Sequence, residues 1–398
     1  MFILPEWIVI LLKFSIFIVS IIVFIHLIFY TLLSYVGLKK PKRDYEVVSD
    51  QKKFLFIIPA HNEETVIGQC LESLRKLNYA KELYEVVVLV DHSDDNTEQE
   101  IAKFSEVYSF VNRYEEGESR GKPHVIGKYL ATLKEQWQAV DYIVLLDADN
   151  LTSANFLTEL NSQFLSNPEY VLIQGYLDSK NIGSSLMSRG YAAAYYMTNR
   201  SIQYAKHQMN WNASVGGTGF ALATDYLEEY GWNPRSYTED FEIQVELSIE
   251  GRQTGWNHFA KIYDEKPNTF KASHVQRTRW SQGHWLIAFS KTKDQIKSLF
   301  EKQSLERRLN RFETLVYSYS MLRAVWLFFL VILVIVDNRF MEDFPDFISF
   351  FYFWVFFEVS NYFLFPTVYI IQEGKAYLNN FKGLGKVKEF LLLWIGYF

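Results

Sequence analysis

Four short apolar runs in the middle of the 398-residue chain constrain its fold most strongly. They are Phe54–Ile58, Val86–Val90, Tyr142–Leu146 and Tyr170–Gln174. Runs with so few polar interruptions are typical of strands that are buried on both faces, as in parallel sheets. Between the first two runs, Glu63–Leu77 carries apolar side chains at helical spacing. A strand, a helix and a second strand in this order predict a parallel sheet with crossover helices, that is, an α/β fold.

Polar and acidic residues directly follow three of these runs. The first is followed by Pro59-Ala-His-Asn-Glu63, the second by Asp91-His-Ser-Asp-Asp-Asn-Thr97 and the third by Asp147-Ala-Asp-Asn150. In such sheets, ligands bind beyond the carboxyl ends of the strands, so these residues are predicted to share one site. In an extended segment Asp147 and Asp149 point to the same side, and paired carboxylates suit a hard divalent cation.

Three common ligand motifs do not fit the chain. The segment around Asp147 lacks the glycine and the closing glutamate of an EF-hand loop. No Gly-x-Gly-x-x-Gly follows a strand and no Gly-x-x-x-x-Gly-Lys-Ser/Thr is present, which excludes Rossmann dinucleotide and P-loop sites. The single cysteine, Cys70, excludes a disulfide framework, and a net charge of −6 gives no electrostatic case for nucleic-acid binding.

Five motifs occur in one order: Arg120-Gly-Lys-Pro123, Asp147-Ala-Asp149, Gly216-Gly-Thr-Gly-Phe220, Thr238-Glu-Asp240 and Gln276-Arg-Thr-Arg-Trp280. With the strand ends, they resemble the family 2 membrane glycosyltransferases, the group of the cellulose, hyaluronan and poly-N-acetylglucosamine synthases. The resemblance covers roughly residues 50–290. It implies a GT-A-like nucleotide-sugar-binding domain, with a mostly parallel sheet and helices on both faces. The Gln-x-x-Arg-Trp pattern is associated with processive members.

The resemblance also implies an inverting transfer of a hexose or N-acetylhexosamine from a UDP-sugar, UDP-glucose or UDP-N-acetylglucosamine, to a growing polysaccharide. Asp240 would be the general base, with Glu239 beside it, and Asp149 would ligate Mg²⁺ or Mn²⁺ with Asp147 nearby. The implied donor-binding residues are Pro59, His61, Glu63, Asp91, Lys122, Asp147 and Arg279. The implied acceptor-binding residues are Thr238, Gln276, Trp280 and Gly217.

The segment after Asp240 gives conflicting signals. Residues 241–250 alternate apolar and polar side chains, which is typical of a strand. The resemblance implies instead a helix that begins near Thr238 and ends at Gly251, and threonine followed by acids is also ordinary helix-start chemistry. We expect the helix.

Both ends of the chain carry membrane signals. Trp7–Leu38 has Lys13 as its only formal charge, is long enough for one crossing, and is too long for the apolar region of a signal peptide. Thr314–Val336 and Phe347–Ile371 are two further candidate spans, interrupted only by Arg323 and by Glu358. Basic residues follow the first and third spans, and the acidic segment Asp337–Asp346 separates the second span from the third, so the positive-inside rule predicts a cytosolic middle region.

These signals predict a multi-pass cell-membrane protein with four regions. Residues 1–44 form an anchor and its basic flank, 45–290 the catalytic domain, 291–312 an amphipathic interfacial segment and 313–398 a membrane region with a partial apolar run at 389–398. The expected partners are a nucleotide sugar, a polysaccharide or lipid-linked acceptor, the lipid bilayer and an accessory membrane subunit. Two alternatives stay open: a transferase that adds one sugar to a polyprenyl phosphate, and a non-catalytic membrane scaffold. The intact aspartates disfavour the scaffold.

Overall fold

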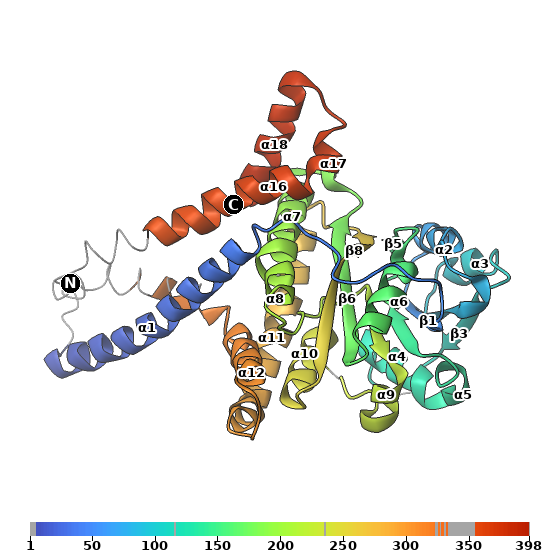
Figure 1. Cartoon of the computed structure of the whole chain (residues 1–398), viewed down its shortest axis with the longest axis horizontal. Helices are drawn as coiled ribbons and strands as arrows, with labels where there is room; N and C mark the ends of the chain where they lie inside the picture. The colour runs from blue at the N-terminus through green and yellow to red at the C-terminus, as the bar shows by residue number, and fades with distance from the viewer. Residues whose placement is uncertain are drawn as a thin grey trace.

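The computed structural model describes residues 5–114, 117–234, 236–322, 325–326, 328–329, 332 and 355–397. Within them, the centre of the molecule is an eight-stranded sheet with the strand order β3-β2-β1-β4-β7-β6-β8-β5 (Figure 1). The strands are β1 Phe54–Ala60, β2 Tyr84–Asp91, β3 Tyr108–Asn112, β4 Tyr142–Leu145, β5 Leu151–Thr152, β6 Tyr170–Ser179, β7 Phe220–Ala223 and β8 Gln253–Asp264. All four predicted strands are therefore present, as β1, β2, β4 and β6.

The sheet is mixed rather than mostly parallel. Strands β1, β2, β3 and β4 pair in parallel, as predicted, and so do β6 and β8. However, β7 runs antiparallel between β4 and β6, and β5 is antiparallel to β8, so three of the seven pairings are antiparallel. The four residues of β7 include two alanines and form no long apolar run, which explains why the sequence pattern did not reveal this strand.

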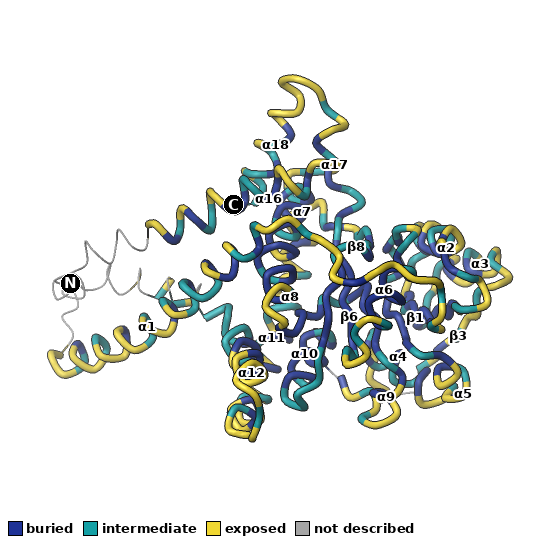
Figure 2. Tube along the Cα trace, viewed as in Figure 1, coloured by how far each residue is buried: buried dark blue, intermediate teal, exposed yellow. Residues whose placement is uncertain are grey.

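Helices cover both faces of the sheet, as predicted. Because side chains alternate along a strand, Phe56 and Ile58 face one core and Leu55 and Ile57 face the other. The first core includes residues of α2 Ile67–Arg75, α3 Thr97–Ile101 and α6 Phe156–Ser166. The second includes residues of α4 Lys122–Thr132, α5 Lys134–Trp137, α9 Thr224–Tyr230 and α10 Glu239–Ile249. Figure 2 shows the sheet as the most buried part of the molecule.

A helical layer lies between this α/β unit and α1 (Figure 1). Its long member, α11, runs without interruption from Phe270 to Leu299, so the predicted boundary near residue 290 falls inside a helix. The other elements of this layer and of the C-terminal region are η2 Ile182–Ser184, α7 Leu186–Met197, the π-helical η3 Thr198–Tyr204, α8 Ala205–His207, α12 Leu305–Ser318, η4 Ser360–Leu364, α16 Phe365–Glu373, α17 Lys375–Leu378 and α18 Gly383–Tyr397; the short η1 Lys81–Leu83 precedes β2.

The described residues contain one helix that is long and apolar enough to cross a membrane, α1 Glu6–Val36, with 31 residues. Figure 2 shows α1 projecting from the body of the protein with most of its surface exposed. Parts of the predicted spans 314–336 and 347–371, and all of the acidic segment 337–346 between them, lie outside the described residues. The multi-pass topology therefore stays a prediction. The apolar run near the end of the chain belongs to α18, which packs on α7 around Leu393.

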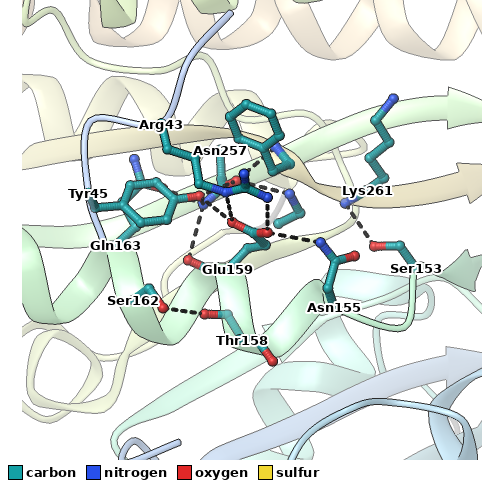
Figure 3. Close-up of polar contacts among 12 residues, drawn as sticks. Arg43, Tyr45, Ser153, Asn155, Thr158, Glu159, Ser162, Gln163, Asn257 and Lys261 are labelled. Carbon is teal, nitrogen blue, oxygen red and sulfur yellow. Dashed lines mark hydrogen bonds and ion pairs between the residues drawn. The ribbon is translucent and has the colours of Figure 1, made fainter. Parts of the chain in front are cut away.

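A polar network fastens the segment that follows α1 to the α/β unit (Figure 3). The Arg43 guanidinium donates to both carboxylate oxygens of Glu159 on α6, at 2.9 and 2.6 Å. The Tyr45 hydroxyl donates to the same carboxylate at 2.7 Å and accepts from Asn257 of β8 at 2.9 Å. Burial raises the pKa of Glu159, but the bonds from Arg43 and Tyr45 outweigh burial and hold it below the usual value. The segment after α1 is thus tied to the α/β unit by an ion pair between the exposed Arg43 and the buried Glu159 carboxylate.

Candidate active site

Lys122 joins three of the predicted site segments. It occupies the first position of α4, the helix that follows β3, so its side chain starts near the carboxyl edge of the sheet. Gly121, directly before it, has φ 105°. The Lys122 Nζ lies 2.7 Å from Asp147 Oδ1 and 2.9 Å from Glu239 Oε1, and it donates to the Gly217 carbonyl at 2.5 Å. Residues far apart in the sequence thus meet around one ammonium group.

Asp240 lies on the first turn of α10, as the family resemblance implied. Its Oδ1 accepts from the Phe241 N–H at 2.8 Å, and the Gly217 N–H also donates to the carboxylate. Burial and the neighbouring Glu239 raise the pKa of Asp240 to about 7, although these two N–H groups and Lys122 act in the opposite direction. A carboxylate with a pKa near the working pH is suited to accept a proton in a reaction.

The Asp-x-Asp segment directly follows β4, and its side chains alternate as expected. Asp147 and Asp149 are half-buried on one side, whereas Ala148 and Asn150 are buried on the other. The Thr218 hydroxyl accepts from the Asp147 N–H at 2.9 Å and donates to Asn150 Oδ1 at 2.6 Å. The glycine-rich motif therefore holds the acidic segment in place.

A second carboxylate approaches Asp149 from the end of β8. Asn150 Nδ2 donates to Asp149 Oδ1 at 2.8 Å and to Asp264 Oδ1 at 3.3 Å. Burial and the carboxylates of Asp264 and Asp147 raise the pKa of Asp149 to about 8. Lys180 partly offsets this effect, and it donates to the Asp149 carbonyl at 2.7 Å.

The donor set of this region fits a divalent cation. Its acids outnumber its lysines: Glu63, Asp147, Asp149, Glu239, Asp240, Asp264 and Glu265 against Lys122, Lys180 and Lys266. Among the described residues, no three His, Cys, Asp or Glu side chains form a complete ligand cluster. One or two carboxylates completed by substrate phosphates and water is the usual arrangement for Mg²⁺. Asp149 and Asp147 are therefore the residues that would hold Mg²⁺ or Mn²⁺.

Residues at the ends of β1 and β2 form the other side of the site. Asp91 is buried, accepts from Asn112 Nδ2 at 3.2 Å, and lies 3.3 Å from His92 Nδ1. The rings of His61 and His92 lie 4.3 Å apart. Burial and nearby carboxylates, Asp147 first among them, raise the pKa of Glu63. Pro59 lies on β1 next to this group, paired with Leu89 of β2.

Backbone strain coincides with these two strand ends. Asn62 has φ 58° and His92 has φ 46°, left-handed conformations that non-glycine residues adopt at a cost. The loops are held by mutual contacts, since the Asn62 N–H donates to Ser93 Oγ and the Asp94 N–H donates to Asn62 Oδ1. Such over-determined strain is concentrated at functional sites.

The Gln-x-x-Arg-Trp residues lie on α11. Trp280 is half-buried and meets Tyr191 of α7 edge-on, with the ring centres 6.4 Å apart. One turn further, Gly283 lies so close to Thr238 that a Cβ built there would be 2.4 Å from Thr238 Oγ1. Gln276 is half-buried and Arg279 is exposed; within the described residues, no hydrogen bond or ion pair joins the Arg279 guanidinium to the acidic cluster.

The structure therefore brings Lys122, Asp147, Glu239, Asp240 and Gly217 into direct contact and places Glu63 and Asp149 beside them. Sequence reasoning missed Asn150, Thr218, Lys180 and Asp264. The first two were visible as neighbours within quoted motifs. Lys180 and Asp264 had no signal, because they follow or end strands whose partners cannot be deduced from local patterns. The roles assigned to individual residues stay predictions.

The chain is similar to a known protein family and to several curated proteins. The model of a family described as "Glycosyltransferase like family 2" matches residues 51–283, more than half of the chain. The probable glycosyltransferase YdaM of Bacillus subtilis is 26% identical over 246 residues, covering 61% of this chain and 57% of that protein. Glucomannan 4-beta-mannosyltransferase 9 of Arabidopsis thaliana is 26% identical over 322 residues, covering 76% and 56%. Poly-beta-1,6-N-acetyl-D-glucosamine synthase of Staphylococcus aureus is 23% identical over 237 residues, covering 59% and 55%.

The chain thus spans just over half the length of these curated relatives. Among solved structures, the mannosyltransferase PcManGT of Pyrobaculum calidifontis, in complex with GDP-Man and Mn²⁺, superposes with a TM-score of 0.53 at 16% identity. The match covers 90% of this chain and 98% of that one. At this identity the likeness concerns the fold, which is a GT-A-like α/β fold.

Proposed function

This chain belongs to the glycosyltransferase-like family 2 and is a glycosyltransferase, and from that premise we propose that it is a membrane-bound inverting enzyme that elongates a polysaccharide. The observation that carries the proposal is the meeting of Asp240, Glu239, Lys122 and the Asp147–Asp149 segment at one edge of the sheet. One carboxylate is suited to take a proton, and the adjoining acids and lysine are suited to a metal-bound diphosphate.

The proposed reaction is a single displacement. Asp240 accepts the proton of an acceptor hydroxyl, whose oxygen forms a bond to the anomeric carbon of the donor sugar. The bond from that carbon to the diphosphate oxygen breaks, and UDP leaves with the electron pair. Lys122 lies where it can bind the departing diphosphate, and Arg279 is the second cation proposed for it, because a guanidinium fork binds two phosphate oxygens. Mg²⁺ or Mn²⁺ held by Asp149, with Asp147 nearby, would supply Lewis-acid stabilisation of the same charge.

The donor is proposed to be UDP-glucose or UDP-N-acetylglucosamine. The buried Asp91 carboxylate, beside His61 and His92, can accept an N–H of the base or a hydroxyl of the ribose. The names of the relatives include a mannosyltransferase and an N-acetylglucosamine polymer synthase, and the similar fold of PcManGT was solved with GDP-Man. A GDP-sugar is therefore the competing donor that the experiment must include.

The acceptor is proposed to be a growing chain that passes Trp280, with Gln276 and Thr238 beside it. An aromatic face suits the C–H side of a sugar ring, and Trp280 is half-buried against Tyr191. Exposed apolar side chains on α11, on α12 and in the turn between them support docking on the bilayer: Leu286, Phe289, Phe300 and Leu305 are 59%, 66%, 84% and 70% exposed. Together with α1, they favour a catalytic domain held on the cytosolic face.

A donor panel tests this function. The full chain in native membranes or detergent is incubated with Mg²⁺ or Mn²⁺ and labelled UDP-glucose, UDP-N-acetylglucosamine or GDP-mannose, and product size is measured. We expect release of UDP and a labelled polymer. Turnover of GDP-mannose alone would refute the UDP donor, and a single-sugar lipid product would refute elongation. If no sugar is transferred from any donor, the proposed function is refuted and the non-catalytic scaffold is favoured.

A further inference from the structure

A short segment, Ser214–Gly217, contacts two of the reacting groups of the proposed site, Asp240 and Lys122. It precedes the rest of the glycine motif and belongs to no helix or strand. Its last residue, Gly217, has φ 50°, donates its N–H to Asp240 and accepts from Lys122 through its carbonyl. The position of this segment therefore sets how the proposed base and the proposed phosphate-binding lysine face each other.

Three buried glutamines from three separate elements satisfy the backbone of this segment. The N–H groups of Ser214, Val215 and Gly216 donate to the Oε1 atoms of Gln203, Gln244 and Gln174, at 2.9, 3.0 and 2.9 Å. These glutamines belong to η3, α10 and β6, and their exposed fractions are 4%, 5% and 0%. An isolated segment without ladder partners must find other acceptors for its buried N–H groups, and side-chain amides supply them here.

Gln244 differs from the other two in where it lies. It follows Asp240 by four residues on α10, so the two side chains lie on the same face of the helix, one turn apart. Helix α10 therefore accepts two hydrogen bonds from the segment: Gln244 accepts from Val215, and Asp240 accepts from Gly217. Gln174 and Gln203 also donate back to carbonyls in or beside the segment, at Thr218 and at Ser214. Among the described residues, Gln244 Nε2 has no hydrogen-bond partner, so its contact with Val215 is the one that holds it.

The far end of the segment reaches the helices near the membrane. Ser214 Oγ lies 3.3 Å from Lys206 Nζ, which forms a 2.7 Å ion pair with Glu313 of α12. Both charged side chains are fully buried, and the Tyr30 hydroxyl of α1 donates to Glu313 at 2.9 Å. The segment is thus fixed at one end to α1 and α12 and at the other to the proposed catalytic groups.

We propose that Gln244 is a positioning residue of the transfer reaction, which acts by holding Val215 so that Gly217 presents its N–H to Asp240 and its carbonyl to Lys122. The inference rests on the proposed function, because it assumes that Asp240 is the base. The groups that face Asp240 are Glu239 on its own helix, Lys122 of α4, Tyr195 of α7 and Tyr317 of α12. Loss of the Gly217 N–H would remove one of the groups that favour the ionised carboxylate.

The test compares two glutamine-to-methionine variants of the full chain. Q244M keeps the side-chain size but removes the acceptor for Val215, whereas Q295M removes an equally buried glutamine of α11 whose Oε1 accepts from Ser318 Oγ. In the described chain neither glutamine has a partner for its Nε2, so the two losses are matched. We expect Q244M to lower kcat by roughly 10–100-fold with KM for the donor little changed, because small misplacements of reacting groups have effects of this size. The acid limb of its kcat–pH profile should move to higher pH, and Q295M should match the wild type in both.

Equal kcat and equal pH profiles for Q244M and Q295M would overturn the proposal. If Q244M does not accumulate, the variant Q244E is measured in its place. It keeps an acceptor for the Val215 N–H and adds a carboxyl group one turn from Asp240. We then expect wild-type kcat at high pH with the acid limb displaced upward, and an unmoved limb would contradict the inference. D240N is measured in parallel, since an active D240N refutes the base itself, whereas an inactive D240N with a normal Q244M refutes only the positioning role.

Discussion

Replacing Asp240 by asparagine is expected to lower kcat by roughly 10²–10⁴-fold while the affinity for UDP stays nearly unchanged. The substitution removes the proton acceptor but leaves Lys122, Asp147 and Asp149 in place. The pH dependence of the activity provides a second test of the role of Asp240. Because burial and Glu239 raise the pKa of Asp240 to about 7, the wild-type base becomes active as pH rises through that value. Activity should therefore climb from pH 6 to pH 8, and D240N should lose this climb.

The control for D240N is Arg279→Ala. Arg279 is exposed on α11 and is proposed to bind the diphosphate, so its removal should weaken UDP affinity as well as turnover. Calorimetric titration of UDP into both variants, with rates in the same detergent, gives the comparison. If D240N loses nucleotide binding as severely as R279A, Asp240 is a donor-site or structural residue, and Glu239 becomes the first candidate for the base.

Asp149→Asn is expected to abolish turnover even at saturating donor. The variant removes the charge of the carboxylate that would hold the metal, and the loss should exceed the roughly 10–100-fold that loss of a supporting partner costs at metal sites. Binding of Mn²⁺ in the presence of UDP, followed by electron paramagnetic resonance, should weaken in parallel. This readout does not depend on the activity of the loaded enzyme.

Asp94→Asn is the matched control for the metal variant. Asp94 is an exposed aspartate in the loop after β2, on the same edge of the sheet, and its backbone N–H rather than its carboxylate makes the local hydrogen bond. D94N should keep wild-type turnover and Mn²⁺ affinity. Full activity of D149N, or of the wild type in excess chelator, would refute the metal assignment.

The strands that sequence patterns revealed are those buried on both faces. β1, β2, β4 and β6 form continuous or nearly continuous apolar runs because cores lie on either side of them. β3 escaped notice because it is an edge strand whose side chains are mostly exposed, and β8 because polar residues such as His258 and Lys261 interrupt its apolar pattern. An apolar run indicates a strand that is buried on both faces, and an edge strand has too few buried side chains to produce such a run.

Helix α10 shows why a period-two pattern can arise in a helix. Phe241 and Val245 pack toward Ile287 of α11, whereas Ile243 and Leu247 pack toward the sheet. Two apolar stripes on opposite sides of one helix place apolar residues at alternate positions, which resembles a strand in the sequence. The family resemblance resolved this ambiguity, since the local pattern alone favoured the wrong element.

The sequence motifs predicted which segments form the site, but they did not predict which side chains contact one another. Parallel strand ends must meet at one edge, so the proximity of Glu63, Asp91 and Asp147 followed from the topology. The bridge from Lys122 to Glu239, and the approach of Asp264 to Asp149, depend on how α10 and β8 return to that edge. Single buried glutamines such as Gln244 carry no pattern at all, because their function depends on one backbone N–H from a distant segment.

The anomeric configuration of the product tests the central claim most directly. If Asp240 activates the acceptor for a single displacement, an α-linked UDP-sugar must give a β-linked product. The full chain is supplied with the UDP-sugar that it turns over, and the new linkage is read by nuclear magnetic resonance from the coupling of its anomeric proton. A β-linkage is the predicted result, and an α-linkage would contradict the account of Asp240 as the base of an inverting transferase.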